Sequence, residues 1–166
     1  MEDMRKSSVI MVLLAVVLIM AIGYAAFAQQ LTINGSAEIN STWDVHIEDI
    51  AVNNTTLDAE NVSTSVGDNH LSATFNANLT TPGSSVTYDV TVKNGGTLDA
   101  KLDSIVFTDS NNDAIVYSYS GISKDDVIDA GGTQTFTITV TFNDSYTTMP
   151  ESTTSSVTMN LTYVQG

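Results

Sequence analysis

The chain has 166 residues, a formal net charge of −14 and no cysteine. The lack of thiols excludes disulfides, thiolate metal sites and cysteine nucleophiles. The negative charge argues against nucleic acid and anionic lipid as partners. Beyond residue 28 the only basic residues are Lys93, Lys101 and Lys124, whereas Glu2 and Asp3 are the only acidic residues before it. This composition is typical of one exported domain that is held together by its core alone.

Residues 1–28 have the pattern of a secretory signal peptide, with a basic start, an uncharged apolar run from Val9 to Ile22 and then small residues. Two cleavage positions fit. Ala26-Phe27-Ala28 has the small-x-small form and would make Gln29 the first residue, and the other position lies just before Phe27. The alternative is a retained membrane helix, because Val9 to Ala28 is mostly apolar and about twenty residues span a bilayer. The pattern favours export with cleavage.

Residues 29–42 are predicted to contain a strand at the new amino end. Its apolar and small positions alternate with polar ones and are Leu31, Ile33, Gly35, Ala37 and Ile39. Such a strand can pair within its own sheet, or it can insert into a neighbouring subunit and complete the neighbour's sheet. The second arrangement is a heterologous contact that does not close and therefore generates filaments. The pattern alone favours pairing within the chain.

Residues 43–166 are predicted to form an all-β domain, because apolar and polar residues alternate along most of its segments. The expected strands are 43–47, 71–79, 86–92, 101–106, 114–119, 136–142 and 157–163, and one helical turn is expected at 123–128. Turn signals separate several of these strands, and they are Thr81-Pro82-Gly83, Asn94-Gly95-Gly96, residues 109–113 and Ala130-Gly131-Gly132. Short strands with one apolar face each predict an antiparallel β-sandwich.

Candidate catalytic groups are few. His46 and His70 have no metal-ligand spacing, and no serine lies in a G-x-S-x-G motif, so we expect no enzyme. Asp109, Asn111 and Asp113 place oxygen ligands at alternate positions, as a calcium loop does. The same residue types are typical of a tight turn, and the turn is the favoured interpretation. We therefore expect no cofactor, with calcium at this loop as the alternative.

One part of the sequence resembles the TasA/camelysin family of secreted matrix-fibre proteins. The similar stretches are "GYAAF", "LTINGSA" and "ATFNANLTTPGSSVTYDVTVKNGGTLDAKLDSI". In that family an aromatic, two Ala and Phe end a signal that a dedicated signal peptidase cuts, and a strand with small residues follows. This chain is shorter than TasA and lacks its lysine-rich insertions. Camelysin is described as a metalloprotease, but no zinc motif is present here to carry that activity over.

The resemblance implies a jelly-roll-like sandwich that is secreted and polymerises by donor-strand exchange into filaments of an extracellular matrix or cell surface. Its partners would be copies of itself and other matrix proteins, and it would meet a membrane only through the helix before cleavage. We expect the acceptor to be an edge groove formed by Val157 to Tyr163 or by Phe136 to Phe142. The alternative is a monomeric surface module for glycans or calcium, tethered by an uncut amino-terminal helix.

Overall fold

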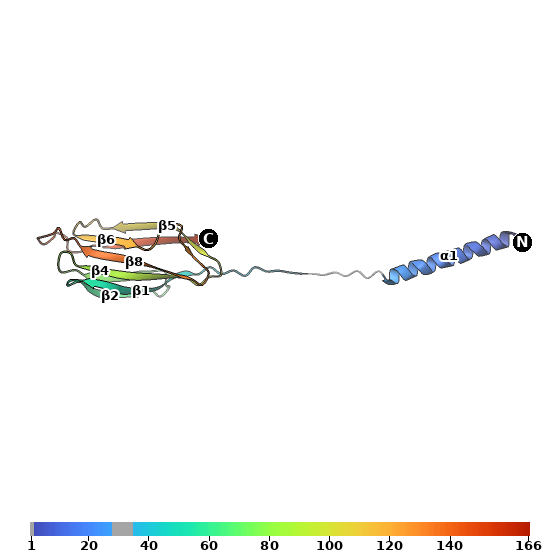
Figure 1. Cartoon of the computed structure of the whole chain (residues 1–166), viewed down its shortest axis with the longest axis horizontal. Coiled ribbons are helices and arrows are strands. Elements are labelled where there is room, and N and C mark those ends of the chain that lie inside the picture. Colours follow the sequence, from blue (N-terminus) through green and yellow to red (C-terminus); the bar gives the residue numbers. More distant parts are fainter. Residues whose placement is uncertain (1, 28–34) are drawn as a thin grey trace. The chain divides into compact units, whose positions relative to one another are not determined.

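The computed structural model describes residues 2–27 and 35–166, with side chains described for residues 5–19 and 35–166. The chain divides into two compact units, residues 1–39 and residues 40–166 (Figure 1). Among the residues predicted to matter, Ala28, Gln29, Leu31 and Ile33 lie outside the described part of the chain.

The first unit contains one helix, α1 (Glu2–Phe27), so the predicted helix at the amino end is confirmed. Ala26 and Phe27, which belong to the expected cleavage motif, form the last residues of α1. Its described apolar side chains are exposed, as Met11 and Ile19 illustrate. Within the described residues, no helix combines the length and the apolar character needed to cross a membrane. Cleavage and export stay predictions.

The second unit is built from antiparallel strands, as predicted. The strands are β1 (Val45–Thr56), β2 (Glu60–Val66), β3 (Ala73–Asn78), β4 (Ser85–Asn94), β5 (Ala100–Asp109), β6 (Ile115–Ser120), β7 (Val127–Ile128), β8 (Thr133–Phe142) and β9 (Val157–Gln165). They form a four-stranded sheet in the order β1-β4-β8-β6, a three-stranded sheet in the order β7-β5-β9 and the hairpin β2-β3.

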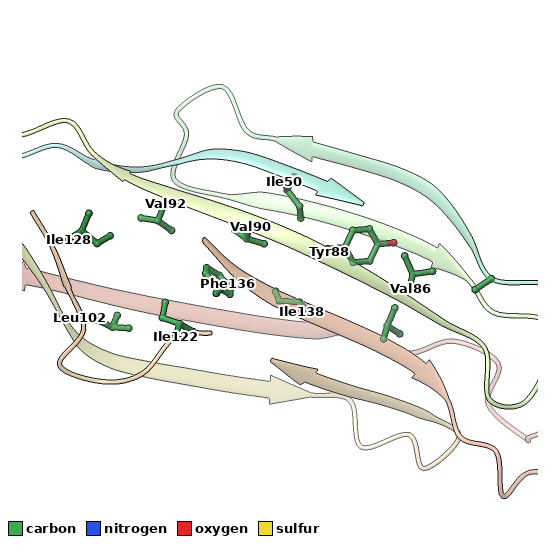
Figure 2. Close-up of a cluster of buried hydrophobic side chains, with 12 residues drawn as sticks. Ile50, Val86, Tyr88, Val90, Val92, Leu102, Ile122, Ile128, Phe136 and Ile138 are labelled. Carbon is green, nitrogen blue, oxygen red and sulfur yellow. The ribbon is translucent and has the colours of Figure 1, made fainter. Parts of the chain in front are cut away.

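The inner faces of the three sheets share one core, with the four-stranded sheet on one side and the other two sheets opposite it (Figure 2). β4 illustrates the alternation, because Val86, Tyr88, Val90 and Val92 are buried while the residues between them are half-exposed. β-Branched residues suit such a strand, since they restrict the backbone to extended conformations and pack well on a pleated surface. Leu102 of β5 enters the same core from the opposite side.

The helical turn predicted at residues 123–128 is wrong, because this segment pairs with β5 instead. Leu102 N donates to Asp126 O at 2.8 Å, and Asp125 N donates to Leu102 O at 2.8 Å. The Asp126 carboxylate accepts from Ser123 N, also at 2.8 Å. Asp125 also has a φ of 73°, which lies outside the right-handed helical region. The segment therefore forms a turn followed by the short strand β7.

Tyr88 gives the domain a pH dependence in the alkaline range. Its ring is fully buried against Phe75, and its hydroxyl donates to Asn76 O at 3.3 Å. In the orientation that satisfies both its oxygen and its nitrogen, the Asn61 side-chain amide donates to the Tyr88 hydroxyl at 3.2 Å. Burial raises the pKa of Tyr88 from 10.0 to about 12, and Tyr163, which is also desolvated, has a pKa of about 12.

The unfolded state should therefore lose these phenolic protons before the folded state does, so stability should fall as the pH rises from about 10 to about 12. We expect Tyr88 to account for about 1–2 kcal/mol of that loss. Urea unfolding at pH 9 and at pH 11 measures the loss. Tyr88→Phe should reduce the difference in the free energy of unfolding between these two pH values. An unchanged difference in Tyr88→Phe would contradict this assignment.

Candidate strand-acceptor groove

Each of the three sheets ends in two edge strands within the described residues, and these are β1 and β6, β2 and β3, and β7 and β9. β9 pairs with β5 along one side only, and β3 pairs with β2 along one side only. An unpaired strand edge presents a row of free N–H and C=O groups and is a template for a further strand. The domain therefore has room for backbone pairing at both β3 and β9.

A single cavity of about 470 Å³ is bordered by β3 and β9, and its lining contains residues from neither β2 nor β5. The unpaired edges of β3 and β9 therefore border this cavity, which we call the β3–β9 groove. Val90 of β4 and Phe136 and Ile138 of β8 form its floor. Phe75 stands on the β3 side and Leu161 on the β9 side. Both segments that the sequence offered as acceptors, β9 and β8, thus contribute to one groove.

Half-buried apolar side chains make up most of the β9 wall. Met159, Leu161 and Tyr163 pack against the core, Val157 is also half-buried, and the residues between them are exposed. Each is only partly covered within the single chain. An incoming strand with apolar residues at alternate positions would bury this wall, and burial of apolar area is the main favourable term in association.

Two histidines lie together at one end of the groove. The rings of His46 and His70 meet edge to face with centroids 5.8 Å apart, and His46 Nδ1 lies 2.9 Å from Asp44 Oδ1. Ile47 N donates to His70 O at 2.8 Å, which fixes the β2–β3 loop against the start of β1. The sequence analysis noted only that these histidines lack a metal-ligand spacing, because no motif links two positions this far apart in the chain.

The amino-terminal segment forms no strand over residues 35–44. Ile39 is 93 % exposed, and the region around Gly35 is open. The predicted strand is therefore not formed at residues 35–39, and residues 31 and 33 lie outside the described part. Of its apolar side chains, the described ones, Ala37 and Ile39, are exposed.

The segment joins the domain at the predicted Asn94-Gly95-Gly96 turn. Gly95 N donates to Asp44 O at 2.7 Å, and Thr97 N donates to Thr42 O at 3.1 Å. A Cβ at Gly96 would lie 2.6 Å from Thr42 O, so only glycine allows this close approach. The two glycines therefore fix the point where the amino-terminal segment leaves the domain.

The candidate calcium loop after β5 is closed by its own hydrogen bonds. Asp109 Oδ1 accepts from Asn111 N at 3.0 Å, and Asn143 Nδ2 donates to the backbone oxygen of Asp113 at 3.0 Å. Asn111 has a φ of 52°, a conformation that asparagine tolerates in turns. Throughout the described part of the chain, no three His, Asp or Glu side chains are grouped so that they could hold a metal. Calcium binding at Asp109, Asn111 and Asp113 stays a prediction.

The lysines of the second unit each lie beside a carboxylate. Lys93 Nζ is 2.8 Å from Glu48, Lys101 Nζ is 2.7 Å from Asp125, and Lys124 Nζ is 3.6 Å from Asp103. The hydrogen bond to Lys93 lowers the pKa of Glu48, and the hydrogen bond to Asp125 raises the pKa of Lys101. These exposed pairs add little stability, but they leave the other carboxylates of the surface without a neutralising lysine.

No protein family model, no curated protein and no solved structure matches this chain.

Proposed function

We propose that this chain is a secreted, non-enzymatic structural protein of the TasA/camelysin type, with a jelly-roll-like β-sandwich. Its copies polymerise into surface or matrix filaments when residues 31–39 of one copy enter the β3–β9 groove of the next. The observation that carries the proposal is a groove with an apolar floor between two unpaired strand edges, in a chain whose amino-terminal segment has strand alternation.

Backbone and side chains would both contribute to this contact. The inserted segment would exchange backbone hydrogen bonds with β3 on one side and β9 on the other, as in other cases of strand addition. Leu31, Ile33 and Ile39 would place apolar side chains over the floor of the groove at Phe136 and Ile138. Complete burial of such a side chain is worth about 1.5–3 kcal/mol. The groove therefore favours an apolar, extended occupant.

Negative-stain electron microscopy of the purified chain that begins at Gln29 tests the proposal at neutral pH, with and without calcium. Filaments in both conditions are the expected result. Filaments that form only with calcium would support assembly and add a cation to it. Uniform small particles in both conditions would overturn the proposal and favour a monomeric binding module.

A further inference from the structure

The two strands beside the groove run in opposite directions. β1 begins beside the end of β4, with Val45 opposite Asn94, and we call this end of the domain the Asn94 end. β3 also begins there, because His70, just before β3, accepts a hydrogen bond from Ile47 N. β9 ends there, because Gln165 pairs with Ala100 at the start of β5. A strand inserted between β3 and β9 must therefore be parallel to one and antiparallel to the other.

The longer of these two edges decides the direction. β9 has nine residues and β3 has six. Antiparallel pairing is slightly more stable per residue than parallel pairing, so the antiparallel ladder should form along the longer edge. Residues 31–39 match the length of β9 and can pair with all of it. Resting on the proposed function, we infer that this segment of a second copy lies antiparallel to β9 and parallel to β3, with Ile39 opposite Val157.

Side-chain size agrees with this register. Gly35 falls opposite Leu161 and Ala37 falls opposite Met159, so the two smallest residues of the segment face two large residues of the β9 wall. All four lie on the inner face, because a register that pairs odd-numbered residues keeps the alternation of both strands in phase. A slip of one residue would turn the apolar side of the segment outward.

The inferred direction gives a contact between donor and acceptor that does not close on itself. Ile39 lies at the Val157 end of the acceptor, and Val45 of the donor follows only a few residues later. The Asn94 end of each donor therefore meets the opposite end of its acceptor, which gives a head-to-tail contact that continues indefinitely. The reverse direction would bring two Asn94 ends together, and two copies could then exchange segments and close as a dimer. The direction of one strand thus separates a filament from a dimer.

Disulfide trapping tests the direction without background, because the native chain has no cysteine. In the inferred register Glu38 lies opposite Thr158, whereas in the reversed register it lies opposite Val164. All three side chains are exposed, so cysteine at these positions should not disturb the core. Only residues with Cα atoms about 4.4–6.8 Å apart form an unstrained disulfide. Mild oxidation should therefore link Glu38→Cys/Thr158→Cys into a ladder of multimers and leave Glu38→Cys/Val164→Cys unlinked.

The outcomes separate this inference from the proposed function on which it rests. Suppose that assembled species are present, as filaments by microscopy or as dimers by sizing, and that only Glu38→Cys/Val164→Cys forms the disulfide. This result would overturn the inferred direction and keep strand exchange. Filaments with neither link would also overturn the inferred pairing with β9. A disulfide within single monomers of either variant, or the lack of any assembled species, would overturn the proposed function itself. The single variant Glu38→Cys controls for random disulfides.

Discussion

Removing residues 29–40 from the chain that begins at Gln29 should abolish filaments and leave a folded monomer. The remaining chain keeps Thr42 and Asp44, which hold the amino end to the Asn94-Gly95-Gly96 turn. It also keeps the core and the β3–β9 groove, but it has no segment to donate. Sedimentation velocity would show the loss of all high-mass species, and a cooperative urea transition would show that the domain still folds. Filaments from this chain would contradict the donor assignment.

The acceptor side allows a matched experiment. Leu161→Asp places a charge on the β9 wall of the groove and should block insertion, because an unpaired charge is costly beside an apolar strand. Thr162→Asp, one residue further along on the exposed face, is the control and should still assemble. Mixing Leu161→Asp with the chain that lacks residues 29–40 should give one-to-one pairs and nothing longer. Each partner then supplies the one part that the other lacks.

Asn94→Ala should lower the free energy of unfolding by about 3 kcal/mol, the largest loss that we expect from a single polar residue in this domain. The Asn94 side chain is fully buried, and its Nδ2 donates to Leu98 O at 2.8 Å and to Ile128 O at 3.0 Å. Its Oδ1 accepts from Gly96 N at 3.1 Å. Alanine would leave these backbone groups buried without partners, and each such group costs about 1–3 kcal/mol.

Urea unfolding of Asn94→Ala measures this loss, and Asn53→Ala is its control. The Asn53 side chain donates to the Asp89 carboxylate at 2.8 Å and 2.9 Å, but this pair lies on the exposed face of the sheet. Water can replace the lost bonds there, so we expect a change of about 0.5 kcal/mol or less. Equal losses in the two variants would show that burial of Asn94 does not govern its contribution.

The strands that alternate without interruption could be predicted from the sequence. In β8 the residues Phe136, Ile138 and Val140 are buried, and the threonines between them face outward, because a side-chain period of two maps directly onto the two faces of a sheet. β2 could not be predicted in this way. Its Val62 is exposed, and a register shift between Asn61 and Ser63 interrupts the alternation. A bulge moves later side chains to the other face, so the pattern is lost.

The groove depends on which strands pair, and local patterns do not carry that information. The sequence indicated that β9 has one apolar face, but not that β9 pairs with β5 and leaves its other edge free beside β3. The nearness of His46 and His70 follows from the same long-range arrangement. The helical turn at 123–128 failed for a related reason, because hydrogen bonds to Leu102 are formed only once β5 is in place.

The pairing of Lys93, Lys101 and Lys124 with carboxylates has a consequence for an assembled fibre. A head-to-tail array of such domains would be a polyanion whose repulsion acts along its whole length. At 0.01 M salt the screening length is about 30 Å, comparable to a small domain, whereas at 0.15 M it is about 8 Å. Neighbouring subunits would therefore repel each other far less at physiological ionic strength than in dilute buffer. The fibre would also concentrate counterions and water around itself, which is the physical basis of a swollen, hydrated gel.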